Sequence, residues 1–233
     1  EGTVLFSEDF SNEEECAFDG GEIIDGRLYL TDGVLIEGVG SSAPMLRKEF
    51  STGGREVKSA RLYATAAGIY YLYLNGQAVS EDCFNPGWTD FYTRIRYQTY
   101  DVTDMIQSGN NAIAAELGLG WYAGRGLAGT YGASAPALLA KLVVEYTDGT
   151  REVIATDSSW QSTANGPIKM NDFFLGETYD ARLEMPGWKE VGFNDSEWLP
   201  AKETTKEALN LGEITAQIAP QVRQMETVSP ISV

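Results

Sequence analysis

The chain is built from short apolar runs that end at Gly, Asn or Asp, and it contains no long segment with the 3.6-residue period of an amphipathic helix. Residues 60–65 and 69–74 are two such runs. The second ends in Asn75-Gly76, a pair that favours a two-residue hairpin turn because both positions tolerate positive φ angles. Many short strands separated by turn signals predict an all-β protein, an antiparallel sandwich of jelly-roll type.

A second hairpin is predicted around Asp148-Gly149, with residues 138–146 and 151–155 as its arms. Alternate residues of the first arm are apolar, so they share one face of the strand. The residues expected to face the core are Ala140, Leu142, Val144 and Tyr146.

Helix is expected only as single turns, at residues 102–107 and 193–198. The candidate caps are Asp101 or Thr103 for the first turn and Asn194 or Asp195 for the second.

The chain contains no histidine, which excludes Ser-His-Asp and Cys-His catalysis, histidine-ligated zinc and a histidine general base. Asp and Glu number 34 against 17 Lys and Arg, so the formal net charge is −17. That charge repels phosphate backbones and anionic lipid, and neither nucleic acid nor a membrane is an expected partner. An acidic surface suits a neutral sugar or a divalent cation, and it also simply keeps a protein soluble.

The two cysteines, Cys16 and Cys83, are far apart and form no C-x-x-C pattern. A disulfide between them and two free thiols both remain open from the sequence. No apolar run is long enough for a membrane-spanning helix.

Three parts of the chain are predicted. Residues 1–43 form a strand-rich N-terminal segment around an acidic run, and residues 44–203 form the main sandwich. Residues 204–233 are expected to be an extended connector, because Pro220 and Pro230 suit an edge or a linker better than a central strand.

Several ordered blocks give the chain a family resemblance over residues 44–233. It resembles the N-terminal β-sandwich region of bacterial α-L-rhamnosidases, which are large sugar-cleaving enzymes. The blocks are ARLY at 60–63, YLYLNG at 71–76, PGWTD at 86–90, YQTYDVT at 97–103, LGLGWY at 117–122, GETYDAR at 176–182, FNDSEW at 193–198 and AQ at 216–217.

The resemblance implies a galactose-binding-like sandwich that belongs to an enzyme hydrolysing terminal α-L-rhamnose. In this family the catalytic acid and base lie in an (α/α)₆ barrel, and no such helices are expected here. The implied role is a non-catalytic part that supports the barrel and contacts sugar; its partners are rhamnose-containing glycans and the remaining domains of the parent enzyme. The alternatives are an autonomous calcium-dependent carbohydrate-binding module and a structural docking domain. The resemblance implies a bacterial source, with a secreted, cell-surface or cytoplasmic location left open.

Sugar recognition needs an aromatic face for the C–H side of the ring and fixed polar groups for its hydroxyls. Trp88 and Trp121 each have a glycine as neighbour and are the candidate platforms, with Asp90 and Tyr122 as polar partners. The alternative is that the two tryptophans pack in the core or against a neighbouring domain. The resemblance also leads us to expect a polar residue where this chain has Leu119.

No cofactor is required by these patterns, and Ca²⁺ is the one candidate ion, because some related domains bind rhamnose through calcium. Calcium takes several oxygen ligands, including carboxylates. The candidate ligands are Asp82, Asn85 and Asp90 in one loop region and Asn171 and Asp172 in another.

Two further motifs are assigned structural roles. Glu177 and Asp180 lie three residues apart in an extended segment and are not expected to be the two catalytic carboxylates of a glycosidase. We expect Arg182 to pair with a carboxylate in a structural role instead. The glycines from Gly118 to Gly129 are followed by a strand and not by a helix N-terminus, which favours a long mobile loop over a phosphate site.

Overall fold

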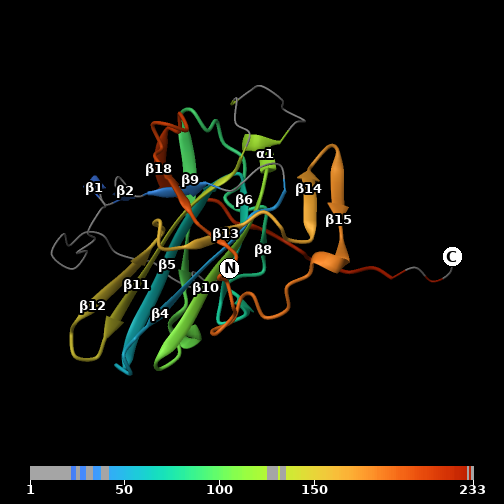
Figure 1. Ribbon diagram of the computed structural model, residues 1–233. Helices are drawn as coiled ribbons and strands as arrows, with labels where there is room; N and C mark the ends of the chain where they lie inside the picture. The colour runs from blue at the N-terminus through green and yellow to red at the C-terminus, as the bar shows by residue number, and fades with distance from the viewer. Residues whose placement is uncertain are drawn as a thin grey trace.

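The computed structural model describes residues 22–24, 27–29, 34–37, 42–124, 131, 135–229 and 231. In this part of the chain two β-sheets pack face to face (Figure 1). The larger sheet runs in the order β1 (Glu22–Ile24), β2 (Arg27–Tyr29), β18 (Glu213–Ala216), β9 (Arg94–Asp101), β5 (Val57–Ala67), β11 (Ala137–Tyr146), β3 (Leu35–Glu37) and β17 (Lys202–Thr204), with β12 (Arg151–Ala155) paired to β11.

The smaller sheet runs in the order β16 (Leu199–Pro200), β13 (Gln161–Thr163), β4 (Met45–Ser51), β10 (Asn110–Gly118), β6 (Ile69–Leu74) and β7 (Gln77–Ala78). Two small ribbons flank it: β14 (Ile168–Asp172) with β15 (Gly176–Tyr179), and β8 (Asp82–Cys83) with β19 (Val222–Arg223). Helix among the described residues is confined to η1 (Thr103–Met105), α1 (Gly120–Ala123) and η3 (Ala181–Leu183). The prediction of an all-β sandwich is confirmed.

Alternation along the strands builds the core between the two sheets. Ala140, Leu142, Val144 and Tyr146 of β11 are all buried there, as the sequence predicts. They face alternate residues of β6 and β10, among them Leu72 and Ile113 on the opposite sheet. Trp160 closes this core and is completely buried.

Both predicted hairpins are present. Asn75 and Gly76 have φ of 51° and 83°, the positive values that a tight turn between β6 and β7 requires. Gly149 has φ of 84° in the turn that joins β11 to β12. The predicted turn at residues 102–107 contains η1, and the Oδ1 atom of Asp101 accepts the Thr103 N–H at 3.1 Å.

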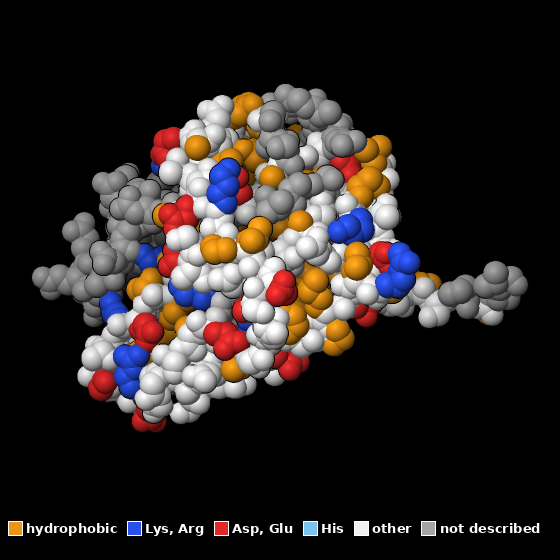
Figure 2. Space-filling model, viewed as in Figure 1, with side chains coloured by type: hydrophobic (Ala, Val, Ile, Leu, Met, Phe, Trp, Pro, Cys, Tyr) orange, Lys and Arg blue, Asp and Glu red, His pale blue; other side chains and the backbone are white. Residues whose placement is uncertain are grey.

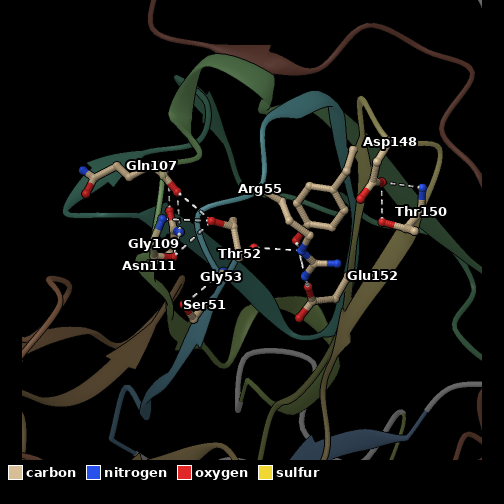
Figure 3. Close-up of polar contacts among 11 residues, drawn as sticks. Ser51, Thr52, Gly53, Arg55, Gln107, Gly109, Asn111, Asp148, Thr150 and Glu152 are labelled. Carbon is tan, nitrogen blue, oxygen red and sulfur yellow. Dashed lines mark hydrogen bonds and ion pairs between the residues drawn. The ribbon is translucent and has the colours of Figure 1, made fainter.

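Polar contacts close one end of the sandwich, where the turn after β4 meets the start of β10 and the β11–β12 hairpin (Figure 3). The Thr52 hydroxyl accepts the Gly109 N–H at 2.9 Å, and the Thr52 N–H donates to the Gly109 carbonyl at 2.9 Å. Arg55 binds the Glu152 carboxylate and lies 3.7 Å from the centroid of the Tyr146 ring. Burial and the Glu152 carboxylate raise the pKa of Tyr146 to about 12.

Each sheet is also covered on its outer face. Over the larger sheet, Tyr63 and Tyr97 pack with residues of α1 and with Phe91. Over the smaller sheet, Met45 and Ala114 pack against Trp188 and Trp198 from the segment between η3 and β16. Trp198 therefore holds the turn at residues 193–198 against a sheet, and the Asn194 side chain accepts the Ser196 N–H in that turn.

One strand pair departs from the antiparallel pattern. β18 lies parallel to β9, with Glu213 opposite Arg94 and Ala216 opposite Tyr97. Through β18, the segment predicted as a connector joins the larger sheet, and β1, β2 and β3 join it from the N-terminal segment. The pairings therefore cross both predicted boundaries, and the division at residues 43 and 203 stays a prediction.

Within the described ranges, none of the helices has the length and apolarity needed to span a bilayer. The Cys83 Sγ atom lies 3.7 Å from the Glu81 carbonyl oxygen. Cys16 and two of the loop glycines, Gly126 and Gly129, fall outside the described residues. The pairing of the two cysteines therefore stays open.

Candidate functional site

Three aromatic rings from distant parts of the chain meet where β10 leads into α1, and we call this group the aromatic corner. Trp121 lies with its ring centroid 4.5 Å from that of Phe173, and Phe84 lies 5.4 Å from Phe173 and 6.3 Å from Trp121. Phe84 and Phe173 are exposed and Trp121 is partly buried. The corner thus offers aromatic faces at the surface, as a sugar platform requires.

The corner depends on a close approach of backbone segments. Gly120 has φ of +55°, and a Cβ atom there would lie 2.9 Å from the Gly68 carbonyl carbon. Only glycine fits this position without a shift of the neighbouring backbone. Phe84 also has a positive φ, of 59°, which costs about 1–2 kcal/mol for a non-glycine residue. Its ring contacts with Trp121 and Phe173 offset that cost.

Polar groups from β14 border the rings. The Oδ1 atom of Asn171 accepts the Leu119 N–H at 2.7 Å, and its Nδ2 atom is buried with no hydrogen-bond partner among the described residues. The Oδ1 atom of Asp172 accepts the Phe174 and Leu175 N–H groups at 2.8 and 3.0 Å. The free donor of Asn171 is the kind of group that a sugar hydroxyl satisfies.

The tip of the β14–β15 hairpin extends the apolar surface of the corner. Phe174 is 67% exposed and Leu175 is 56% exposed. Figure 2 shows hydrophobic side chains in the region of this hairpin.

The four residues predicted from sequence to bind sugar have different surroundings. Trp121 belongs to the aromatic corner, whereas Tyr122 is only 3% exposed and donates its hydroxyl to the Leu209 carbonyl at 2.7 Å. Burial raises the pKa of Tyr122 to about 12. Trp88 is 62% exposed on the loop that follows Phe84. Asp90 uses its carboxylate within its own turn, where Oδ2 accepts the Thr93 hydroxyl at 2.7 Å.

Sequence reasoning did not single out Phe84 or Phe173. The apolar run Phe173-Phe174-Leu175, placed between Asp172 and Gly176 in a turn, was the signal that could have identified one of them. The sequence did name Trp121, Asn171 and Asp172, as parts of two separate hypotheses. The structure brings these three residues to one corner.

The candidate calcium ligands make contacts with other protein groups. No group of three or more Cys, Asp or Glu side chains in these parts of the chain is arranged to hold a metal. The Oδ1 atom of Asp82 binds Arg223 at 2.7 Å, and the Asn85 amide donates to the Tyr100 hydroxyl at 2.9 Å. The Oδ1 atoms of Asn171 and Asp172 accept backbone N–H groups, and the calcium hypothesis stays a prediction.

The motif at 176–182 has the structural role predicted for it. Arg182 binds Asp180 with Nε at 2.8 Å and Nη2 at 2.6 Å, and the Asp180 carboxylate also accepts the Arg182 N–H at the start of η3. This contact holds the pKa of the Asp180 carboxyl below its ordinary value. A carboxylate engaged in this way is not available as half of a glycosidase pair.

Comparisons with known proteins match most of the chain to one domain family. Residues 55–226 match a family model described as the α-L-rhamnosidase N-terminal domain. An α-L-rhamnosidase from Streptomyces avermitilis is 47% identical over 188 residues, which make up 79% of this chain and 18% of that protein.

Two solved structures have the same fold. The S. avermitilis α-L-rhamnosidase complexed with L-rhamnose matches with a TM-score of 0.75 and 44% identity, over 81% of this chain and 18% of that one. The α-L-rhamnosidase from Aspergillus terreus matches with a TM-score of 0.76 and 38% identity, over 84% of this chain and 23% of that one. The chain therefore spans about a fifth of the length of the proteins it resembles.

Proposed function

Because this chain belongs to the family of α-L-rhamnosidase N-terminal domains, we propose that it is the non-catalytic sandwich of an enzyme that hydrolyses terminal α-L-rhamnose from glycans or glycosides. The sandwich supports the catalytic region, which is one of its partners, and holds sugar at the aromatic corner. The observation that carries the sugar-binding part is the meeting of Trp121, Phe84 and Phe173 beside the unsatisfied Asn171 amide.

Two physical facts support a non-catalytic role. The chain has no histidine to act as a general base. The Asp180 carboxylate of the motif that most resembles a catalytic pair is neutralised by Arg182 on the surface. A glycosidase instead needs two carboxyl groups on either side of the scissile bond, one of them with a raised pKa.

The isolated chain should show no turnover of an aryl α-L-rhamnoside. The measurement is release of the aryl alcohol, with the full-length S. avermitilis enzyme as the positive control. Turnover that stays with this chain through purification would contradict the non-catalytic assignment.

L-Rhamnose should bind at the aromatic corner, and Trp121→Ala should weaken that binding by a factor of about two to ten, because a stacked aromatic ring contributes about 0.5–1.5 kcal/mol. Chemical shifts of the tryptophan indole N–H groups during a rhamnose titration measure it. Trp121→Phe keeps a ring and should retain most of the affinity. Trp88→Ala is the matched control, because Trp88 is exposed and its ring is not one of the three that form the aromatic corner.

Chelation of divalent ions should leave this binding unchanged, since no group of three or more Cys, Asp or Glu side chains among the described residues is placed to hold a metal. Equal titrations with and without EDTA test this point. Absence of any rhamnose response at the Trp121 indole would leave the corner as an apolar docking surface for the rest of the enzyme.

A further inference from the structure

A second concave site lies on the outer face of the smaller sheet, away from the rings of the aromatic corner. It is a cleft of about 480 Å³, within the range of about 300–1,000 Å³ that small-ligand sites occupy. Glu116 of β10 lines it from the sheet, Tyr179 of β15 lines it from the side, and residues 184–190 form the opposite wall (orange in Figure 1). We call it the Glu116 cleft.

The wall of the cleft is fixed to the sheet by a buried arginine. The Arg47 Nε atom donates to the Trp188 carbonyl at 3.0 Å, and its Nη2 atom donates to the Glu190 carbonyl at 2.9 Å. The Trp188 ring meets Tyr73 of β6 edge to face, with centroids 6.1 Å apart. The cleft is therefore preorganised, and a ligand would not have to order its wall.

Four charged side chains line the cleft: Glu116, Glu184 and Glu190 are acidic, and Lys189 is basic. Among the described residues, neither the Glu116 carboxylate nor the Lys189 ammonium has a hydrogen-bond or ion-pair partner; Lys189 instead lies with Nζ 3.5 Å from the centroid of the Tyr73 ring. Burial raises the pKa of Glu116 against the opposing effect of Lys189, and burial lowers the pKa of Lys189. Both groups are therefore partly desolvated and can still form hydrogen bonds with a ligand.

The three carboxylates repel an anion, and the Lys189 ammonium repels a cation. A sugar hydroxyl avoids this conflict, since it donates to the carboxylate and accepts from the ammonium. Glu184 adds a fixed acceptor, because the Tyr179 hydroxyl donates to it at 2.5 Å and holds it in place. The chemistry fits a neutral polyhydroxylated ligand.

We propose that the Glu116 cleft is a second carbohydrate subsite, which binds a neutral mono- or disaccharide with Glu116 accepting from its hydroxyls and Lys189 donating to them. The inference extends the proposed function to a different surface and does not require sugar to bind at the aromatic corner. The β14–β15 hairpin links the two sites: Tyr179 at its base lines the cleft, and Phe173 at its tip belongs to the corner.

The test is a titration of the whole chain with L-rhamnose and with a rhamnosyl-glucose disaccharide, followed at the indole N–H groups of Trp188 and Trp121. A saturable shift at Trp188 with either sugar is expected. Glu116→Gln and Lys189→Gln should each weaken that response about tenfold or more, because each removes a charge-assisted hydrogen bond. Neither variant should change the response at Trp121, so failure of one site is distinguishable from failure of the other.

The matched control is Glu226→Gln, the same chemical change at an exposed carboxylate that does not line the cleft. Thermal melting checks that each variant is folded. Ethylammonium and inorganic phosphate serve as charged probes and should not shift Trp188. Saturation by either ion in place of sugar, or no sugar response at Trp188 in the folded wild-type chain, would overturn the proposal.

Binding in the cleft should weaken as the pH falls from neutral into the acid range. Protonation of Glu116 removes the charged acceptor, and burial moves that protonation above the usual range of a glutamate. Lys189 and Glu177 also act on this carboxylate, and Glu184 and Glu190 line the same cleft. In Glu116→Gln the remaining affinity should therefore lose its pH dependence; if the dependence persists, a different carboxylate carries it and the role given to Glu116 is wrong.

Discussion

Replacing Arg47 by methionine should lower the free energy of unfolding by about 3–5 kcal/mol, the usual cost of removing one partner from a buried ion pair. The Arg47 side chain is 1% exposed and sits under the segment between η3 and β16. It binds the Asp195 and Glu49 carboxylates as well as the Trp188 and Glu190 carbonyl groups. Methionine fills much of the space but removes the arginine donor from all four acceptors, of which Glu49 keeps the Gly192 N–H.

Lys48→Met is the matched control, because Lys48 is the next residue and makes a single ion pair at the surface, 3.2 Å from Asp157. Exposed pairs of this kind contribute about 0–1 kcal/mol. Denaturant unfolding of the two variants should therefore separate them by at least about 2 kcal/mol. The Trp188 response to sugar should also disappear in Arg47→Met, since the wall of the cleft loses its anchor. Equal costs for the two variants would show that Arg47 does not fix this segment.

Local chemistry made much of this fold predictable. Asn75-Gly76 and Asp148-Gly149 set their hairpins through backbone preferences that need no distant partner. The alternation in residues 140–146 identified the buried face of β11 for the same reason. Strand order could not be obtained in this way. The parallel pairing of β18 with β9 joins residues more than 100 positions apart and has no local signal.

In the two sites, too, the sequence reveals local chemistry but not which distant residues meet. Trp121, Asn171 and Asp172 carry chemistry that is visible in the sequence, yet their meeting at one corner depends on how β14 lies against the end of β10. Phe84 and Phe173 read as ordinary apolar residues until their exposure is known. Glu116 and Lys189 were missed because a charged residue within an apolar strand pattern becomes unusual only when the opposite wall of its cleft is placed.

The tryptophans illustrate this limit most clearly, because the sequence alone does not distinguish a tryptophan buried in the core from one exposed at the surface. Trp160→Ala should cost about 3–5 kcal/mol of stability, the range for emptying a buried aromatic site. Trp160 is 0% exposed within the central core, and its indole N–H donates to the Ala155 carbonyl at 2.9 Å. The substitution removes the packing of the ring and leaves that carbonyl unpaired.

Trp88→Ala makes the same chemical change at a side chain that is 62% exposed, and it should alter stability by no more than about 0.5 kcal/mol. Denaturant unfolding of both variants, with equal slopes against denaturant concentration, gives the comparison. A large loss for Trp88→Ala would show that this residue is buried by a part of the molecule beyond the described residues. A small loss for Trp160→Ala would mean that the two sheets do not close on one another around Trp160, because no well-packed core tolerates removal of its largest side chain.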